Sequence, residues 1–270
     1  MHNENEVIIK ISEIFEEIGV PSMVVGASAR DILCLTFGLP KAIRMTSDVD
    51  FGIFVKDWDE LKIVDDHLKR KEGIQKIGGK ENRVRYHFKG LPFDIVPFGG
   101  IEKDHKVSWP PFYDTIMTVL GFEEALKYSL TISIKKKEIR VVAPEMLIAL
   151  KLIAWNENPS REKDASDAWF LINNYDKLEP AIYEYILDHE LSLFEEFDLA
   201  PDMTSSLYIG VKLKKLLNME TLIHLRKILS MDHNLEKMAS IATIEIPIIY
   251  KVEKARLVFK SLQALRRALE

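Results

Sequence analysis

Three aspartates supply the first chemical clue in this sequence. Asp48 and Asp50 stand one residue apart at the start of the apolar run DVDFGIFV, and Asp94 interrupts a second apolar run, LPFDIVPFGG. Alternate side chains of a β-strand point to the same face, so Asp48 and Asp50 should lie side by side. Like charges this close raise each other's pKa unless a cation lies between them. Because hard divalent cations prefer oxygen ligands, the three carboxylates predict a magnesium site, provided that the strand with Asp94 lies beside the first.

A site of this kind suits phosphoryl or nucleotidyl transfer, in which two metal ions about 4 Å apart stabilise the attacking and leaving oxygens. A turn of small residues, Gly26-Ala27-Ser28, follows the apolar run SMVV and precedes a helical pattern. The backbone amides of such a turn, together with the positive end of the helix, favour a phosphate group. We therefore predict an enzyme that uses a nucleoside triphosphate, with Arg30 as a further nucleotide-binding residue. Arg30 could instead form a plain ion pair with Asp31.

The carboxylates also have ordinary interpretations. Asp48 could cap a loop, and Asp50 could pair with Arg44. The order of a glycine turn, an Asp-x-Asp pair and a later aspartate inside an apolar run favours the metal site over each of these. The seven histidines are scattered and there is one cysteine, so a structural zinc site is not expected.

The segments that carry these residues alternate between strand and helix patterns. Strand patterns cover SMVVG, DVDFGIFV, NRVRYHFKG, LPFDIVPFGG and the hairpin-like KYSLTISIKKKEIRVVAP, and helix patterns cover residues 6–19, SARDILCLTFG and WDELKIVDDHLKRK. Residues 89–92 form a hairpin-like break between two of the strands. After Pro144 nearly every segment has helical periodicity. We predict an α+β protein, in which residues 1–143 form a catalytic domain with a mixed sheet flanked by helices and residues 144–270 form an all-helical domain.

Composition excludes several classes of protein. The chain has 270 residues, of which 47% are hydrophobic, and a net charge of −5. No apolar run approaches the roughly 20 residues that span a bilayer, and the acidic N-terminal segment does not resemble a signal peptide. We expect no membrane association and a reducing, cytoplasmic location, which the single cysteine favours. The negative charge predicts no DNA-sequence recognition, although a local basic groove stays compatible with it.

The ordered motifs resemble the DNA polymerase β-type nucleotidyltransferase superfamily. Its signature is a Gly-Gly or Gly-Ser turn, an Asp-x-Asp pair and a third carboxylate on a later strand, matched here by Gly26-Ala27-Ser28, Asp48-Val49-Asp50 and Asp94. Within the superfamily the chain is most similar to the AbiEii-type nucleotidyltransferases, which include toxins of toxin–antitoxin pairs. These carry a lysine on the first helix after the α/β half and then an Arg-x-Lys-Asp-x-x-Asp stretch. The matching residues are Lys151, Arg161, Lys163, Asp164 and Asp167.

The resemblance implies a role for each motif. Asp48 and Asp50 would bind the magnesium ions that carry the triphosphate, for which manganese could substitute. Asp94 would complete the second metal site and could accept the proton of the acceptor hydroxyl, either directly or by lowering the pKa of that hydroxyl through the metal. Ser28 would contact the terminal phosphates. This implies a nucleotidyltransferase-type fold for the first domain.

The helical domain would contribute Lys151, Lys163 and Asp164 to nucleotide binding. Lys151 would neutralise triphosphate charge, although a helix lysine in an apolar stripe can also extend its ammonium into solvent. Lys163 and Asp164 could equally belong to a capping box with solvated charges, because Ser160 stands three residues before Lys163.

Our leading hypothesis is a magnesium-dependent transfer of a nucleoside monophosphate to a hydroxyl, with release of pyrophosphate. The acceptor would be a tRNA end, a protein side chain or a small molecule, and a toxin role would add an antitoxin protein as partner. The alternatives are a non-catalytic module that binds nucleotide or a partner, an aminoglycoside-type antibiotic nucleotidyltransferase, and a metal-dependent phosphohydrolase.

Overall fold

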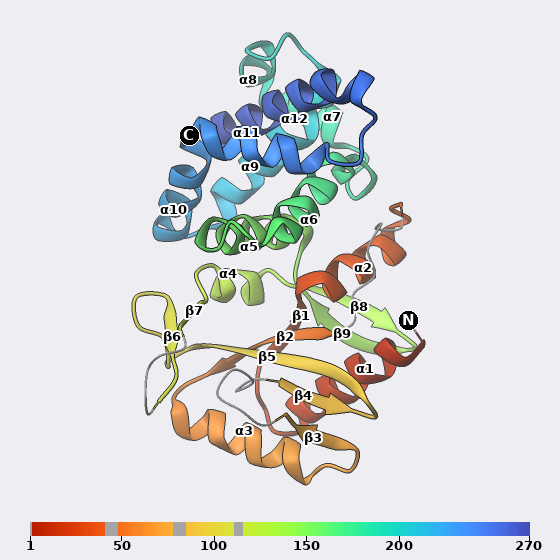
Figure 1. Ribbon diagram of the computed structural model, residues 1–270, viewed down its shortest axis with the longest axis vertical. Coiled ribbons are helices and arrows are strands. Elements are labelled where there is room, and N and C mark those ends of the chain that lie inside the picture. Colours follow the sequence, from red (N-terminus) through yellow and green to blue (C-terminus); the bar gives the residue numbers. More distant parts are fainter. Residues whose placement is uncertain (1, 41–47, 78–84, 111–115) are drawn as a thin grey trace. The chain divides into compact units, whose positions relative to one another are not determined.

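The computed structural model describes residues 2–40, 48–77, 85–110 and 116–270. The chain forms two compact units (Figure 1). The first ends at Ala143, and the second begins at Pro144 and also includes Phe37–Pro40. A mixed sheet with helices in the first unit and a run of helices in the second confirm the predicted α+β class.

The first unit is organised by one mixed sheet, to which the described residues contribute seven strands in the order β3-β4-β5-β2-β1-β9-β8. The pairs β2–β5 and β1–β9 are parallel, and the other neighbours are antiparallel. The strands are β1 Ser22–Val25, β2 Val49–Val55, β3 Ile74–Lys76, β4 Arg85–Phe88, β5 Leu91–Gly99, β8 Leu130–Ile134 and β9 Lys137–Val141. Strands distant in the sequence, such as β2 and β5, therefore become direct neighbours.

Helix α1, His2–Glu17, packs on one face of this sheet because its apolar residues recur at helical spacing. Phe15 of α1 meets Phe51 of β2 edge to face, with ring centroids 5.6 Å apart, and Phe51 in turn meets Phe93 of β5. The alternate residues of these strands point to the other face of the sheet, where Phe98 of β5 contacts Phe122. Phe122 opens helix α4, Phe122–Lys127, so both faces of the central strands are covered.

The remaining elements of the first unit flank this core. Helix α2, Gly26–Phe37, follows β1 directly, and helix α3, Trp58–Arg70, is capped by Asp57, which accepts a hydrogen bond from the amide of Glu60. Strands β6, Lys106–Ser108, and β7, Ile116–Thr118, pair in a separate small sheet. Because α2 begins at the residue directly after β1, its N-terminal end lies at the end of this central strand.

The second unit is built from helices. They are α5 Pro144–Glu157, α6 Glu162–Asn173, α7 Ile182–His189, α8 Leu191–Glu195, α9 Thr204–Leu216, α10 Met219–Ser230, α11 Asp232–Ala242 and α12 Ile248–Leu269, with short 3-10 turns η2 Tyr175–Lys177 and η3 Pro201–Met203. Helix α5 is buried on all sides from Pro144 to Ile153. Helices α9 and α12 approach closely at Gly210, where a methyl group would overlap Ala268. Among the described residues, no helix combines the length and apolar character that crossing a bilayer requires.

Candidate functional site

Sheet register places three of the charged residues in one row. Asp50 of β2 stands opposite Asp94 of β5, and Asp94 stands opposite Arg85 of β4. Partners opposite one another on neighbouring strands share a face of the sheet. The predicted pair Asp50 and Asp94 is therefore brought together, and an arginine extends the row.

Arg85 supplies the positive charge for this row. Its Nε donates to Asp94 Oδ1 at 2.7 Å, and its Nη2 donates to Asp94 Oδ2 at 2.7 Å and to Asp48 Oδ2 at 2.9 Å. The hydrogen bonds to Asp94, followed by the charges of Asp94, Asp48 and Asp50, raise the pKa of Arg85 above its usual value. One guanidinium thus joins two of the three predicted catalytic aspartates and lies in the field of the third. We call the three aspartates, Asp48, Asp50 and Asp94, the carboxylate row.

Asp48 lies one residue before β2 rather than inside the strand. The buried hydroxyl of Ser28 donates to the backbone carbonyl of Asp48 at 2.9 Å. Ser28 therefore ties the first turn of α2 to the segment that carries Asp48. The Ser28 hydroxyl thus donates its proton to a backbone carbonyl, so it would have to give up this hydrogen bond in order to donate to a phosphate.

Gly26 sets the distance between the small-residue turn and the carboxylates. It has a positive φ of 66°, and the preceding residue, Val25, stands opposite Asp50. A methyl group at Gly26 would overlap Asp50 Oδ2 and lie 3.0 Å from its Cγ. Only glycine allows both this backbone conformation and this approach. The N-terminal end of α2, with Ala27 in its first turn, therefore lies beside the carboxylate row.

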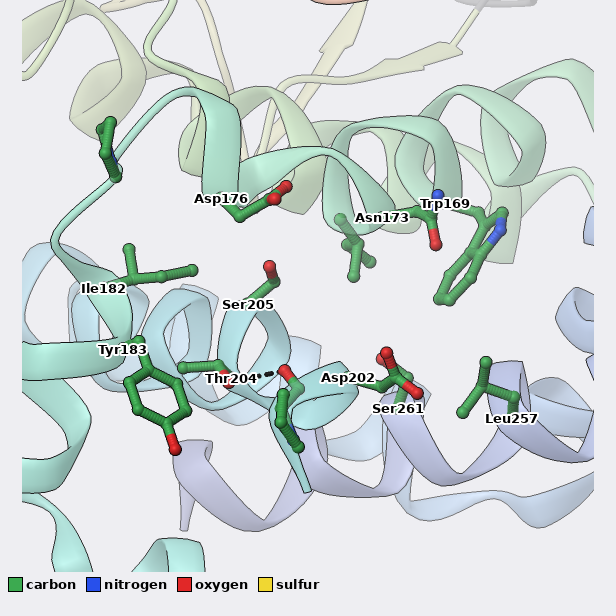
Figure 2. Close-up of a pocket in the computed structure, with 13 residues that line it drawn as sticks. Trp169, Asn173, Asp176, Ile182, Tyr183, Asp202, Thr204, Ser205, Leu257 and Ser261 are labelled. Carbon is green, nitrogen blue, oxygen red and sulfur yellow. Dashed lines mark hydrogen bonds between the residues drawn. The ribbon is translucent and has the colours of Figure 1, made fainter. Parts of the chain in front are cut away.

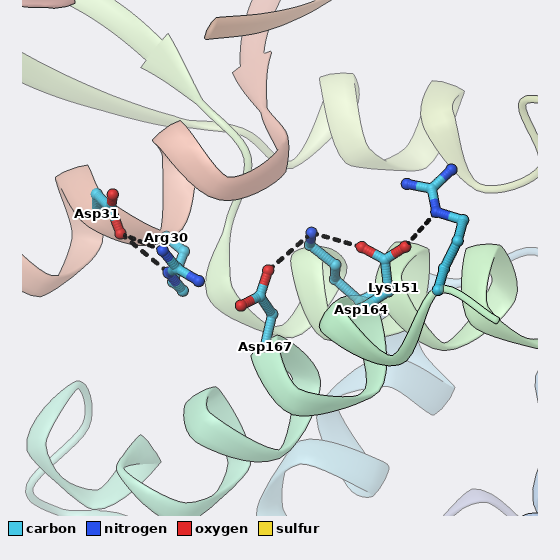
Figure 3. Close-up of polar contacts among 6 residues, drawn as sticks. Arg30, Asp31, Lys151, Asp164 and Asp167 are labelled. Atoms are coloured by element: carbon cyan, nitrogen blue, oxygen red, sulfur yellow. Dashed lines mark hydrogen bonds and ion pairs between the residues drawn. The ribbon is translucent and has the colours of Figure 1, made fainter. Parts of the chain in front are cut away.

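Arg30 and Asp31 form the ion pair that the sequence left open. Both Nε and Nη2 of Arg30 donate to Asp31 Oδ1, at 2.9 and 2.7 Å (Figure 3). Arg30 is 2% exposed, so its charge is compensated in a buried position of α2. Arg44, the alternative partner for Asp50, lies outside the described residues.

The helical unit gathers its own predicted residues into a buried cluster (Figure 3). Lys151 of α5 contacts Asp164 Oδ1 at 2.7 Å and Asp167 Oδ2 at 2.9 Å, both on α6. Arg161 donates to the other oxygen of Asp164 at 2.6 Å. Lys163, in contrast, is exposed on α6. The Lys151 ammonium is balanced by two carboxylates, so it does not extend into solvent as a helix-surface lysine would.

The donor set of the carboxylate row fits a hard divalent cation, because all of its ligand atoms are carboxylate oxygens. Among the residues that the structure describes, no group of three or more His, Cys, Asp or Glu side chains is arranged to hold a metal ion. The Arg85 guanidinium contacts Asp48 Oδ2 at 2.9 Å and Asp94 Oδ2 at 2.7 Å in this arrangement. The residues that would hold a metal at the predicted site are Asp48, Asp50 and Asp94.

Sequence reasoning missed Arg85, although a local signal could have found it. Lys89 and Gly90 both have positive φ, 50° and 82°, and Phe88 stands opposite Leu91. Such a two-residue hairpin turn fixes the register of both strands. Counting back from this turn places Arg85 opposite Asp94.

A pocket of about 350 Å³ lies elsewhere, in the helical unit (Figure 2). Trp169, Asn173 and Asp176 border it, and none of the predicted site residues lines it. Two hydroxyls in its wall are already used: Thr204 donates to the carbonyl of Pro201, and Ser261 bonds to Ser206. The pocket is thus separate from the carboxylate row in its residues and in its chemistry.

Comparison with known proteins gives one family and several weak structural likenesses. None of the curated proteins matched the sequence. The solution structure of the antibiotic-resistance factor ANT(2'')-Ia is 13% identical with a TM-score of 0.42, and the alignment covers 74% of this chain and 99% of that chain. An antigenic nucleotidyltransferase-like protein from Paracoccidioides brasiliensis is 17% identical with a TM-score of 0.42, and the alignment covers 69% and 88% of the two chains.

The family model of the nucleotidyl transferase AbiEii toxin of type IV toxin–antitoxin systems matches residues 33–220. This match extends from α2 to beyond α9 and includes the Asp-x-Asp pair, Asp94 and the Lys151 cluster. Because it covers well over half of the chain, the protein belongs to the AbiEii family of nucleotidyltransferase toxins.

Proposed function

We propose that this nucleotidyltransferase moves a nucleoside monophosphate from a nucleoside triphosphate to a hydroxyl acceptor and that Asp48, Asp50 and Asp94 carry the reaction. The observation that supports this most directly is the carboxylate row. Asp94 shares one guanidinium with Asp48 and stands in register with Asp50. Carboxylates from two separate parts of the sequence thus lie close together on two parallel strands.

Each residue has a distinct task in this proposal. Asp48 and Asp50 would hold magnesium, for which manganese could substitute, and the bound metal would supply charge neutralisation at the phosphates. Asp94 completes the ligand set and accepts the proton of the acceptor hydroxyl. The acceptor oxygen then forms a bond to the α-phosphorus, the bond from that phosphorus to the bridging oxygen breaks, and pyrophosphate leaves with the electron pair.

The turn at the start of α2 supports the phosphate part of the proposal. Helix N-termini favour anions because several backbone amides there have no partner within the helix. Gly26 brings this end of α2 into contact with the side chain of Asp50. A triphosphate that lies between Gly26-Ala27-Ser28 and the carboxylates would meet amides on one side and a metal ion on the other.

The nucleotide-binding roles predicted for Arg30, Lys151, Lys163 and Asp164 stay predictions. Arg30 pairs with Asp31, and Lys151 and Asp164 pair with each other inside the helical unit. These ion pairs show how the side chains are held, and they leave Lys163 as the exposed cation of the set.

The toxin family favours a macromolecular acceptor, a tRNA end or a protein side chain, over a small molecule, and it favours an antitoxin protein as partner. The test is incubation with magnesium, radiolabelled nucleoside triphosphates and cellular RNA or protein fractions. Asp48→Ala and Asp94→Asn should abolish labelling, while Arg140→Gln, which changes an exposed arginine on β9, should not.

Two outcomes would count against the proposal. Labelling that survives Asp94→Asn would remove the third carboxylate from the mechanism. Release of free monophosphate without any labelled acceptor would indicate hydrolysis instead of transfer.

A further inference from the structure

The guanidinium of Arg85 occupies oxygens that a metal ion would need. It uses Asp94 Oδ1, Asp94 Oδ2 and Asp48 Oδ2, at distances between 2.7 and 2.9 Å. A bidentate arginine–carboxylate contact is among the strong hydrogen-bonded pairs in proteins. Both oxygens of Asp94 are therefore engaged before any other cation arrives.

Repulsion among the three aspartates favours a positive charge at the position of the Arg85 guanidinium. Three aspartates within reach of one another repel unless a positive charge lies among them. Asp94 is 19% exposed and Asp48 is 31% exposed, so water screens them only in part. One guanidinium offsets a single charge, and Asp50 also lies in its field. A divalent cation would bring two positive charges to these aspartates, one more than the guanidinium does.

The surroundings of Arg85 allow it to leave. Its side chain is 35% exposed, whereas the backbone of Asp94 is fixed inside β5 between two paired strands. Arginine reaches its partners through a flexible three-carbon stem. Movement of the Arg85 side chain can therefore free the oxygens without a change in the sheet.

We propose that Arg85 is an internal counterion that holds the carboxylate row in the metal-free protein and is displaced when a divalent cation binds to Asp48, Asp50 and Asp94. This inference rests on the proposed function, because it assumes that the three aspartates are the metal ligands. Arg85 acts through these carboxylates, so it is a positioning residue. It lowers the affinity for the metal and stabilises the protein without it.

The test compares the full chain with Arg85→Gln, Arg85→Lys and the control Arg140→Gln, all freed of metal with a chelator. Arg140 is an exposed arginine on β9 of the same sheet, so its replacement removes the same charge without touching the row. Manganese binding is measured by the electron paramagnetic resonance signal of free Mn²⁺, without nucleotide or acceptor. Thermal unfolding with and without Mn²⁺ is the second measurement.

We expect Arg85→Gln to bind Mn²⁺ about tenfold more tightly than the wild type, because the metal no longer has to break charge-assisted hydrogen bonds. The same variant should unfold at a lower temperature without metal and gain more from added Mn²⁺. Arg85→Lys should lie between, since an ammonium cannot reproduce the bidentate contact. Arg140→Gln should match the wild type in both measurements.

A wild type that binds Mn²⁺ as tightly as Arg85→Gln, or more tightly, would overturn the inference, as would the absence of Mn²⁺ binding in every variant. If Arg85→Gln proves too unstable to purify, the comparison of Arg85→Lys with the wild type decides in the same direction. Failure of the proposed function looks different. It would appear as missing nucleotidyl transfer, whichever variant binds the metal better.

Discussion

Replacement of Gly26 by alanine should disturb the carboxylate row through one identifiable contact. Gly26 has a φ of 66°, and a methyl group there would overlap Asp50 Oδ2 and lie 3.1 Å from Asp50 Cβ. Gly19, which follows α1, offers a matched control. It has a φ of 69°, and a methyl group there would meet nothing within 4 Å. Both substitutions impose the same backbone strain, but only the first displaces Asp50.

The magnitudes follow from this difference. A left-handed alanine costs about 1–2 kcal/mol, so Gly19→Ala should lower the free energy of unfolding by that amount. Gly26→Ala should lose the same amount plus about 1–3 kcal/mol for the overlap with Asp50. Urea denaturation measures both values. Mn²⁺ affinity should fall about tenfold in Gly26→Ala, because Asp50 loses its position as a ligand, and should stay within about twofold in Gly19→Ala.

One result would refute this reasoning. If the two variants lost equal stability and bound Mn²⁺ equally well, the contact between Gly26 and Asp50 would not position the carboxylate. Greater loss of stability in Gly26→Ala with unchanged Mn²⁺ affinity would keep the steric argument and remove Asp50 from the metal ligands.

Three further predictions concern other parts of the chain. Burial raises the pKa of Glu102 above its ordinary value of 4.5, so its ionisation costs stability. Glu102→Gln should therefore match the wild type well below pH 4.5 and become more stable than it as the pH rises from 4.5 through the raised pKa of Glu102. An equal difference at every pH in urea denaturation would contradict this. Lys151→Met should cost about 3–5 kcal/mol by leaving two buried carboxylates on α6 without their ammonium, whereas the exposed Lys163→Met should stay within about 0.5 kcal/mol. Gly100→Ala should cost about 3 kcal/mol or more in the same assay, because its methyl group would overlap the backbone oxygen of the residue after β2.

Much of the fold could be predicted because long elements carry their own periodicity. The central strands β2 and β5 and the buried helix α5 appear where the apolar runs predict them. The three-residue strands β3, β6 and β7 are too short for any alternation to be visible. Helix α1 ends at Glu17, two residues before the predicted end, because Gly19 adopts a left-handed conformation there.

For the candidate site, the chemistry of the residues could be predicted from the local sequence, whereas their partners depend on contacts between distant segments. The chemistry of Asp48, Asp50 and Asp94 is visible in the sequence, because charged residues at the start or in the middle of apolar runs require a partner. The identity of that partner depends on strand pairing. Likewise the spacing of Lys151 and Asp164 indicates two neighbouring helices, but only their packing makes the lysine a buried ion pair.

The two-residue turn between β4 and β5 determines which position of β4 faces Asp94, and that position holds Arg85. This turn fixes residue 85 opposite Asp94, and register with β2 then fixes Asp94 opposite Asp50. A neutral residue at position 85 would remove the hydrogen bonds that the guanidinium donates to Asp94 and Asp48, so the metal-free protein would be less stable. Arginine supplies these contacts, since its planar fork reaches Asp94 with two hydrogen bonds and Asp48 with a third. In the mechanism that we propose, the same contacts would compete with the metal, so stability of the metal-free protein and metal affinity would oppose each other at this one side chain.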